Sequence, residues 1–93
     1  MNELTPETVV CRGAEHVETR VGSQTLMMSV TQGKYFSVDA TGNRIWDLIE
    51  QPISVQQIVA TLRTEYNVGA DECEAQVKSF IGELIANGLA VEH

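Results

Sequence analysis

The chain is poor in the residues that nucleic-acid-binding and membrane proteins need. Its 93 residues include six lysines and arginines against thirteen acidic residues, for a net charge of −7. Because nucleic acids and anionic membranes are polyanions, this charge disfavours sequence-independent binding to them and favours a basic or neutral partner. No apolar run approaches the roughly 20 residues of a membrane span, and MNELTPETVV lacks the basic and apolar regions of a secretory signal. The sequence therefore predicts a cytoplasmic protein.

Residues that carry catalysis or bind metals are also scarce. Cys11 and Cys73 are far apart, and neither lies in a C-x-x-C pair, which favours two free thiols over a disulfide or a redox centre. The histidines are His16 and His93, and the chain has no H-x-x-x-H spacing and no glycine-rich phosphate loop. No nucleophile is paired in sequence with a base. We therefore expect no catalytic activity, no metal and no cofactor.

What the chain does contain suits one small globular domain. Apolar residues make up 43% and charged residues 20%, without a low-complexity run. At this length about two thirds of the unfolded surface can be buried around one core, so we expect a single domain over residues 1–93. Residues 1–14 are expected either to be partly disordered or to add a short strand within Thr8–Arg12.

The first half of the chain shows the alternation of β-strands. Two runs, His16–Val21 and Gln24–Val30, alternate apolar and polar residues as half-buried strands require, and Lys34–Val38 returns as a third strand. The alternating positions on the apolar faces are Val17, Thr19 and Val21 in the first run and Leu26, Met28 and Val30 in the second. Residues 22–23 and 31–33 contain glycine and supply the two hairpin turns.

Signals for helices follow in the second half. Asp39 is an N-cap residue for a helix over Ala40–Glu50, which Pro52 ends. Ser54 and Gln57 form a Ser-x-x-Gln capping box at the head of a second helix. The apolar face of this second helix consists of Val55, Ile58, Val59, Leu62 and Tyr66.

A third helix is predicted to begin near Gly69–Asp71 and to end at Gly88, with Leu89 at the hydrophobic contact of a Schellman cap. Its apolar stripe consists of Cys73, Val77, Phe80, Ile81, Leu84 and Ile85. Leu89–Val91 is a candidate for a short terminal strand. A three-stranded antiparallel sheet followed by three helices predicts a winged-helix-like α+β domain.

Winged-helix domains often read DNA, and the third helix is the element that would carry the base-reading residues. A recognition helix normally offers arginine, lysine, asparagine or glutamine to bases and phosphates. This helix offers Lys78 and Gln76 among four acidic residues. Such a composition repels a phosphate backbone, and we expect no DNA binding.

The segment KYFSVDATGNRIW, residues 34–46, joins a strand to a helix with almost no loop. In a sheet of order one, two, three, the strand Lys34–Val38 is an edge with unpaired backbone groups. Apart from Lys34, this edge lacks the charges, proline and bulge signals that protect edge strands. An extended peptide can therefore add to it as a further strand, and the third helix would form the other wall of the groove.

The same segment, followed by DLIE, SVQQIVATLRTEY and a final ELIANGL, resembles the PqqD-like proteins over roughly His16–Val91. Proteins of this family are small modules that recognise the leader part of a ribosomally made precursor peptide. The resemblance implies that the leader lies between the third strand and the third helix. The contact residues that it implies are Lys34, Tyr35, Phe36, Ser37, Val38, Val77, Lys78, Phe80, Ile81 and Leu84.

The resemblance implies a noncatalytic protein that presents the precursor peptide to modifying enzymes. Members of the family serve lasso peptide assembly, with a leader peptidase and a cyclase, and also radical-enzyme systems; we favour the lasso setting. The alternative is a winged-helix adaptor or regulatory protein that binds another protein partner without any precursor peptide.

Several of these residues also have a purely structural interpretation. An apolar helical stripe usually packs in a core, so some of Val77, Phe80, Ile81 and Leu84 are expected to face inward. Trp46 is expected to anchor the core, and Gly42 to allow close packing against the sheet, because glycine inside a helix otherwise costs about 1 kcal/mol relative to alanine. Pairing with an acidic residue of a leader is open to four basic residues, Arg20, Arg44, Arg63 and Lys78, and all of them except Lys78 are expected to be solvated surface charges.

Overall fold

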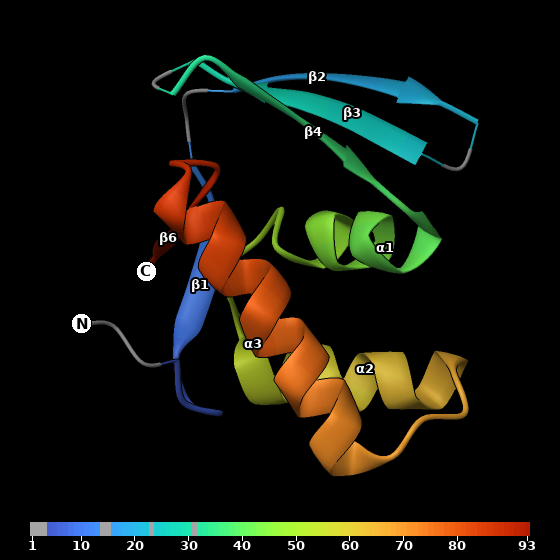
Figure 1. The fold of residues 1–93 in the computed structure, drawn as a ribbon. Coiled ribbons are helices and arrows are strands. Elements are labelled where there is room, and N and C mark those ends of the chain that lie inside the picture. The colour runs from blue at the N-terminus through green and yellow to red at the C-terminus, as the bar shows by residue number, and fades with distance from the viewer. Residues whose placement is uncertain (1–3, 14–15, 23, 31) are drawn as a thin grey trace.

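The computed structural model describes residues 4–13, 16–22, 24–30 and 32–93, which form two small sheets and three helices (Figure 1). One sheet has the order β2–β3–β4, with strands His16–Val21, Gln24–Ser29 and Lys34–Val38. The other has the order β5–β1–β6, with β1 at Val9–Arg12, β5 at Ile53–Ser54 and β6 at Ala90–Glu92. The helices are α1 (Ala40–Leu48), α2 (Val55–Glu65) and α3 (Ala70–Ala86). The predicted α+β class is confirmed. Some of the predictions concern residues outside the described ranges: the turn residues Ser23 and Thr31, and residues 1–3 and 14 of the N-terminal segment.

The second sheet joins distant parts of the chain. Strand β1 pairs antiparallel with β5 on one side and with β6 on the other. Further backbone bonds extend this contact: Arg12 N donates to Ile49 O at 3.0 Å, and Gly13 N donates to Leu89 O at 2.9 Å. Strand β1 falls within the segment Thr8–Arg12 suggested by the sequence, and β6 overlaps the suggested Leu89–Val91 but is shifted by one residue. The two-residue β5 and the pairing of all three strands were not predicted.

The helix starts follow the capping residues of the sequence. Asp39 Oδ1 accepts a hydrogen bond from Gly42 N at 2.9 Å, and Ser54 Oγ accepts one from Gln57 N at 3.2 Å. These bonds satisfy backbone N–H groups that the first helical turn leaves unpaired. Because α1 begins directly after Asp39, the end of β4 is held beside the helical part of the domain.

The end of α3 is a complete Schellman motif. Leu89 N donates to Leu84 O at 2.8 Å, Gly88 N donates to Ile85 O at 3.1 Å, and Gly88 has φ of 75°. Glycine adopts this left-handed conformation without steric cost. Leu89 is fully buried, as the cap predicts, and the chain turns from α3 into β6.

The β2–β3–β4 sheet turns a largely polar side toward the helices, on which Met27, Phe36 and Val38 are the apolar residues that join the core. The alternation expected for the first two strands is present, but Thr25, Met27 and Ser29 are the buried positions of β3, and Leu26 is exposed. On β2, Val17 is exposed. The apolar faces predicted from the sequence therefore point away from the core.

Specific hydrogen bonds explain why the inner side of the sheet can be polar. Thr25 Oγ1 donates to Asn43 Oδ1, and Ser29 Oγ donates to Asn87 O at 2.6 Å. Glu18 Oε2 accepts a hydrogen bond from Trp46 Nε1 at 2.9 Å. Because these buried or half-buried polar groups have partners in the helical layer, the usual cost of desolvating them is offset.

The core lies between the helices and the inner sides of both sheets, and Trp46 is fully buried in it. The Arg12 guanidinium lies 4.5 Å from the centre of the Trp46 ring, and His16 meets the ring edge-on at 5.1 Å. Gly42 is buried where a Cβ atom would lie 3.2 Å from Phe80 Cε1 and 3.2 Å from Val38 Cβ. Both expectations, a core tryptophan and a glycine at a close approach to the sheet, are confirmed.

Candidate functional site

Strand β4 is an edge strand. It pairs with β3 from Thr25 opposite Val38 to Ser29 opposite Lys34, and in the described part of the chain no strand pairs with its other side. Lys34, Tyr35 and Ser37 are exposed, Phe36 is half-buried and Val38 is buried. The backbone groups on the free side are thus available to a further extended chain.

A groove of about 250 Å³ lies between this strand and α3. We call it the β4–α3 groove, and its lining residues are Phe36, Ser37, Val38, Asp39, Phe80, Glu83 and Leu84. Five of the predicted contact residues therefore line one concavity, formed by elements distant in sequence. Asp39 and Glu83 were not predicted. Phe80, Glu83 and Leu84 follow the spacing of one helix face, and this spacing is the signal that could have found Glu83.

The other predicted contact residues do not line this groove. Val77 and Ile81 are buried in the core. Tyr35 lies on the opposite face of the sheet from Phe36, as strand alternation requires. Lys78 is half-buried, and its Nζ lies 2.9 Å from Glu74 Oε2 in an ion pair one turn apart on α3. Their contact with a peptide, like that of Lys34, stays a prediction.

The ionisable side chains that line the groove are both acidic. Asp39 accepts the capping bond from Gly42, and Glu83 is exposed. With the net charge of −7, these carboxylates favour a peptide that is basic or neutral where it passes the groove.

The arginines expected at the surface have partners within the chain. Arg20 Nη2 lies 2.7 Å from Asp47 Oδ1, and Arg44 forms a forked ion pair with Glu65, with Nη2 at 2.8 Å from Oε2. Hydrogen bonds from Arg44 lower the pKa of Glu65 below its ordinary value. These pairs tie β2 to α1 and α1 to α2.

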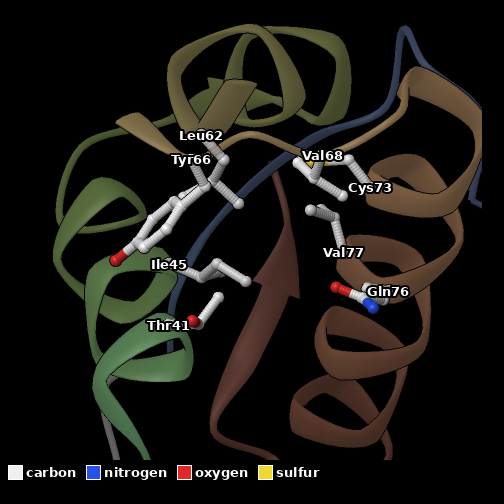
Figure 2. Close-up of a pocket in the computed structure, with 8 residues that line it drawn as sticks. All are labelled: Thr41, Ile45, Leu62, Tyr66, Val68, Cys73, Gln76 and Val77. Atoms are coloured by element: carbon white, nitrogen blue, oxygen red, sulfur yellow. The ribbon is translucent and has the colours of Figure 1, made fainter. Parts of the chain in front are cut away.

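A second concavity, of about 140 Å³, lies among the three helices (Figure 2). Its lining residues are Thr41, Ile45, Leu62, Tyr66, Val68, Cys73, Gln76 and Val77. Figure 2 shows Ile45, Leu62 and Tyr66 on one side of this pocket and Cys73 and Val77 on the other. Because Gln76 and Val77 precede Phe80 by one turn of α3, the pocket continues the line of the groove along that helix.

Cys73 contributes a buried thiol to this pocket. Its Sγ lies 3.9 Å from the Val59 carbonyl oxygen, which accepts the weak hydrogen bond, and burial raises the pKa of the thiol. A raised pKa keeps the sulfur protonated and unreactive. Cys73 is therefore an apolar position of the α3 stripe, as predicted.

The described part of the chain holds neither a metal-binding cluster nor a membrane-spanning helix. Within residues 4–13, 16–22, 24–30 and 32–93, no three His, Cys, Asp or Glu side chains are grouped as a metal site would require. Over the same residues, no helix has the length and apolar character needed to cross a membrane.

Solved structures with the same fold include two leader-peptide complexes. One is TbiB1 in complex with the TbiA(beta) leader peptide; it has a TM-score of 0.78 and 26% sequence identity, over 86% of this chain and 93% of that chain. Another is lasso peptide synthetase B1 complexed with the leader peptide; it has a TM-score of 0.76 and 18% identity, over 88% of this chain and 96% of that chain. The second likeness shows the fold alone.

A comparison with curated proteins finds no match. The sequence profile of the family described as coenzyme PQQ synthesis protein D (PqqD) matches residues 24–90, from the start of β3 to the start of β6. This match spans β4, the three helices and therefore both walls of the β4–α3 groove. The chain belongs to the PqqD family.

Proposed function

We propose that this chain is a noncatalytic recognition protein that binds the leader region of a ribosomally synthesised precursor peptide and delivers it to modifying enzymes. The observation that carries the proposal is the free edge of β4 beside the β4–α3 groove, in a chain of the PqqD family. The leader adds to β4 as a further strand, and some of its side chains enter the groove.

Strand addition supplies affinity and specificity from different groups. Each main-chain hydrogen bond to β4 contributes about 0.5–1.5 kcal/mol net. Alternate residues of an extended peptide point to the same side, so every second leader side chain would face Phe36, Phe80 and Leu84. The groove thus selects apolar side chains at a spacing of two.

The surroundings of the groove define the leader further. Asp39 and Glu83 favour basic or neutral residues at the rim. Beyond β4, the leader would follow α3 toward the N-terminal end of that helix. There the second pocket offers room for one apolar side chain between Ile45 and Val77. We expect such a leader to be extended, with apolar side chains that enter the groove and basic or neutral side chains beside Asp39 and Glu83.

The partners that we propose are a leader peptidase and a cyclase, as in lasso peptide assembly, with radical enzymes as the second candidate set. The chain would act in the cytoplasm, beside the ribosomally made precursor. It would contribute binding and position and leave the covalent chemistry to those enzymes.

Calorimetric titration with the synthetic leader encoded in the same gene cluster tests this function. We expect a dissociation constant on the order of micromolar or tighter, about −8 kcal/mol or better. Phe80→Ala should weaken binding at least tenfold because it removes an aromatic wall of the groove. Ile85→Ala is the matched control: it truncates a half-buried side chain on the same helix outside the groove and should leave leader affinity unchanged.

Two results of that titration would reject the proposal. One is the absence of measurable binding to any leader of the cluster, which would favour an adaptor for another protein partner. The other is an equal loss of leader affinity in Phe80→Ala and Ile85→Ala. The loss would then come from general destabilisation, and the β4–α3 groove would be rejected as the binding site.

A further inference from the structure

Two buried hydroxyl groups lie at the two ends of the ladder that holds β4. Strand β3 pairs with β4 from Thr25 opposite Val38 to Ser29 opposite Lys34. Thr25 and Ser29 are therefore the β3 residues of the first and last pairs, and both are fully buried. Their side chains point to the side of the sheet on which Figure 1 shows α1 and α3. Each hydroxyl is thus placed where it can fix one end of the edge strand.

The hydroxyl of Ser29 ties the Lys34 end of β4 to the C-terminal end of α3. Ser29 Oγ donates to Asn87 O at 2.6 Å and accepts a hydrogen bond from Gln32 N, in the turn that leads into β4, at 3.2 Å. Asn87 is the C-cap residue of α3, and its Nδ2 donates to Glu83 O at 2.8 Å. Glu83 lines the β4–α3 groove. A chain of hydrogen bonds therefore runs from the turn before β4 to the opposite wall of the groove.

The hydroxyl of Thr25 ties the Val38 end of β4 to α1. Thr25 Oγ1 donates to Asn43 Oδ1, which lies in the first turn of α1. The residue before it, Gly42, is the point at which Phe80 of the groove comes close to α1. Both ends of β4 are therefore tied to the helices that support the groove, and residues 35–37 span the distance between the two ties.

These two hydrogen bonds contribute more to position than to stability. Burying a hydroxyl costs free energy that its hydrogen bond largely offsets, whereas an apolar side chain of the same shape carries no such cost. Apolar packing alone lets a strand shift against a helix, while a buried hydrogen bond tolerates only a narrow range of lengths and angles. The inner side of β3 therefore fixes the distance between β4 and the helices more tightly than apolar side chains would.

We propose that Thr25 and Ser29 are positioning residues that set the width of the β4–α3 groove. The inference rests on the proposed function and adds to it the residues that hold the site ready for the leader. Neither side chain contacts the leader, because both are fully buried on β3, one strand away from the free edge. A leader side chain must fit between Phe36 on β4 and Phe80 on α3, so a shift of β4 against α3 changes which side chains can enter.

A positioning role has a kinetic signature. Without one of the two hydrogen bonds, β4 adopts several positions, and only the fraction of molecules with the correct groove width accepts the leader. The association rate falls in proportion to this fraction. The dissociation rate is unchanged, since the bound leader makes the same contacts as in the wild type. The net strength of one hydrogen bond corresponds to a factor of about five.

The test compares variants that remove or keep each hydroxyl, and leader rates are measured by interferometry on the immobilised synthetic leader of the same gene cluster. Thr25→Val removes the hydroxyl and keeps the branched shape, whereas Thr25→Ser keeps the hydroxyl and removes a methyl group. Ser29→Ala removes the second hydroxyl. Thr19→Val is the matched control, because it makes the same change at an exposed position of β2, opposite the exposed Leu26.

We expect Thr25→Val and Ser29→Ala each to lower the association rate about fivefold and to leave the dissociation rate within twofold of wild type. Thr25→Ser and Thr19→Val should leave both rates within twofold. Each slow variant is also combined with Gly82→Ala, which stabilises α3 because alanine favours a helix and the added Cβ meets nothing within 4 Å beyond the backbone of that helix. The combined variants should be more stable to heat and should bind the leader as slowly as before.

Four results would overturn the inference: association rates of Thr25→Val and Ser29→Ala within twofold of wild type, an effect confined to the dissociation rate, an equal loss in Thr25→Ser, or recovery of wild-type binding on addition of Gly82→Ala. The last result would trace the loss to stability. If Ser29→Ala is unfolded by circular dichroism, Thr25→Val carries the test, since its side chain keeps the shape of threonine. Failure of the proposed function is seen separately, as a wild-type protein that binds no leader.

Discussion

Replacing Gly42 by alanine should disturb the leader groove through a single methyl group. A Cβ atom at this buried position of α1 would lie 3.2 Å from Phe80 Cε1, 3.3 Å from Phe80 Cζ and 3.2 Å from Val38 Cβ. These distances are shorter than ordinary contacts, so both the Phe80 ring and the α1–Val38 spacing must give by a few tenths of an ångström. Val38 Cβ is fixed to the β4 backbone, whereas the Phe80 ring can turn toward the open groove. We therefore expect Phe80 to yield and to narrow the site.

Two opposing effects set the change in stability. Alanine gains about 1 kcal/mol over glycine inside a helix, while overpacking a filled core costs about 1–3 kcal/mol. The free energy of unfolding should thus fall by about 0–2 kcal/mol. Leader affinity should fall about two- to tenfold because the displaced Phe80 ring narrows the groove. A tenfold fall corresponds to about 1.4 kcal/mol.

Gly82→Ala is the matched control, because Gly82 lies within α3 and a Cβ atom added there would meet nothing within 4 Å beyond the backbone of its own helix. This variant should gain about 1 kcal/mol, or about 4–8 °C in Tm for a domain of this size, and should bind the leader as the wild type does. Thermal unfolding and calorimetry measure both quantities. The reasoning is refuted if Gly42→Ala is stabilised as much as Gly82→Ala and binds the leader equally well.

Three further predictions follow from charge and burial. The protein should not shift duplex DNA at physiological salt, because its net charge of −7 opposes binding to a polyanion; a salt-sensitive, submicromolar complex would contradict this. The pKa of Glu65 is lowered below 4.5 by hydrogen bonds from Arg44, so this pair stabilises the fold fully above pH 4.5 and its contribution is lost as the pH falls through the lowered pKa. Glu65→Gln should therefore reduce the acid dependence of the unfolding free energy slightly, and an unchanged dependence would argue against the pairing. Native alkylation should label half-buried Cys11 before buried Cys73, whose pKa is raised by burial; mass spectrometry that finds Cys73 labelled first would refute this.

Local signals in the sequence predicted the elements that form the site. Asp39 as N-cap, the capping serine of α2 and the Gly88–Leu89 cap each depend on neighbours in sequence, so they are visible without a structure. The position of β4 as an edge followed from hairpin order alone. A groove between this edge and the third helix was expected from the same argument, whereas its contact residues were expected only through the family resemblance, and the packing of Phe80 against Gly42 was not predicted.

What the sequence did not reveal depends on long-range pairing. Strand β1 is joined to β6 by residues at opposite ends of the described chain, and no local pattern signals this pairing. The inner face of the main sheet was assigned the wrong way round because alternation identifies two faces without saying which one packs on the core. The partners of Glu18 and Ser29 in the helical layer decide that question, and they lie 28 and 58 residues away.

Amide hydrogen exchange measured by NMR, with and without the synthetic leader, tests the central claim most directly. Leader binding should give the largest shift changes and the largest gain in protection at Lys34–Val38, because the free backbone groups of β4 enter a new ladder. The N–H groups of Phe36 and Ser37 point to opposite edges of β4. Proline at the residue whose N–H points to the free edge should impair docking without damaging the sheet. Changes that cluster instead on β2 or on α2 would contradict strand addition at β4, even if the leader binds.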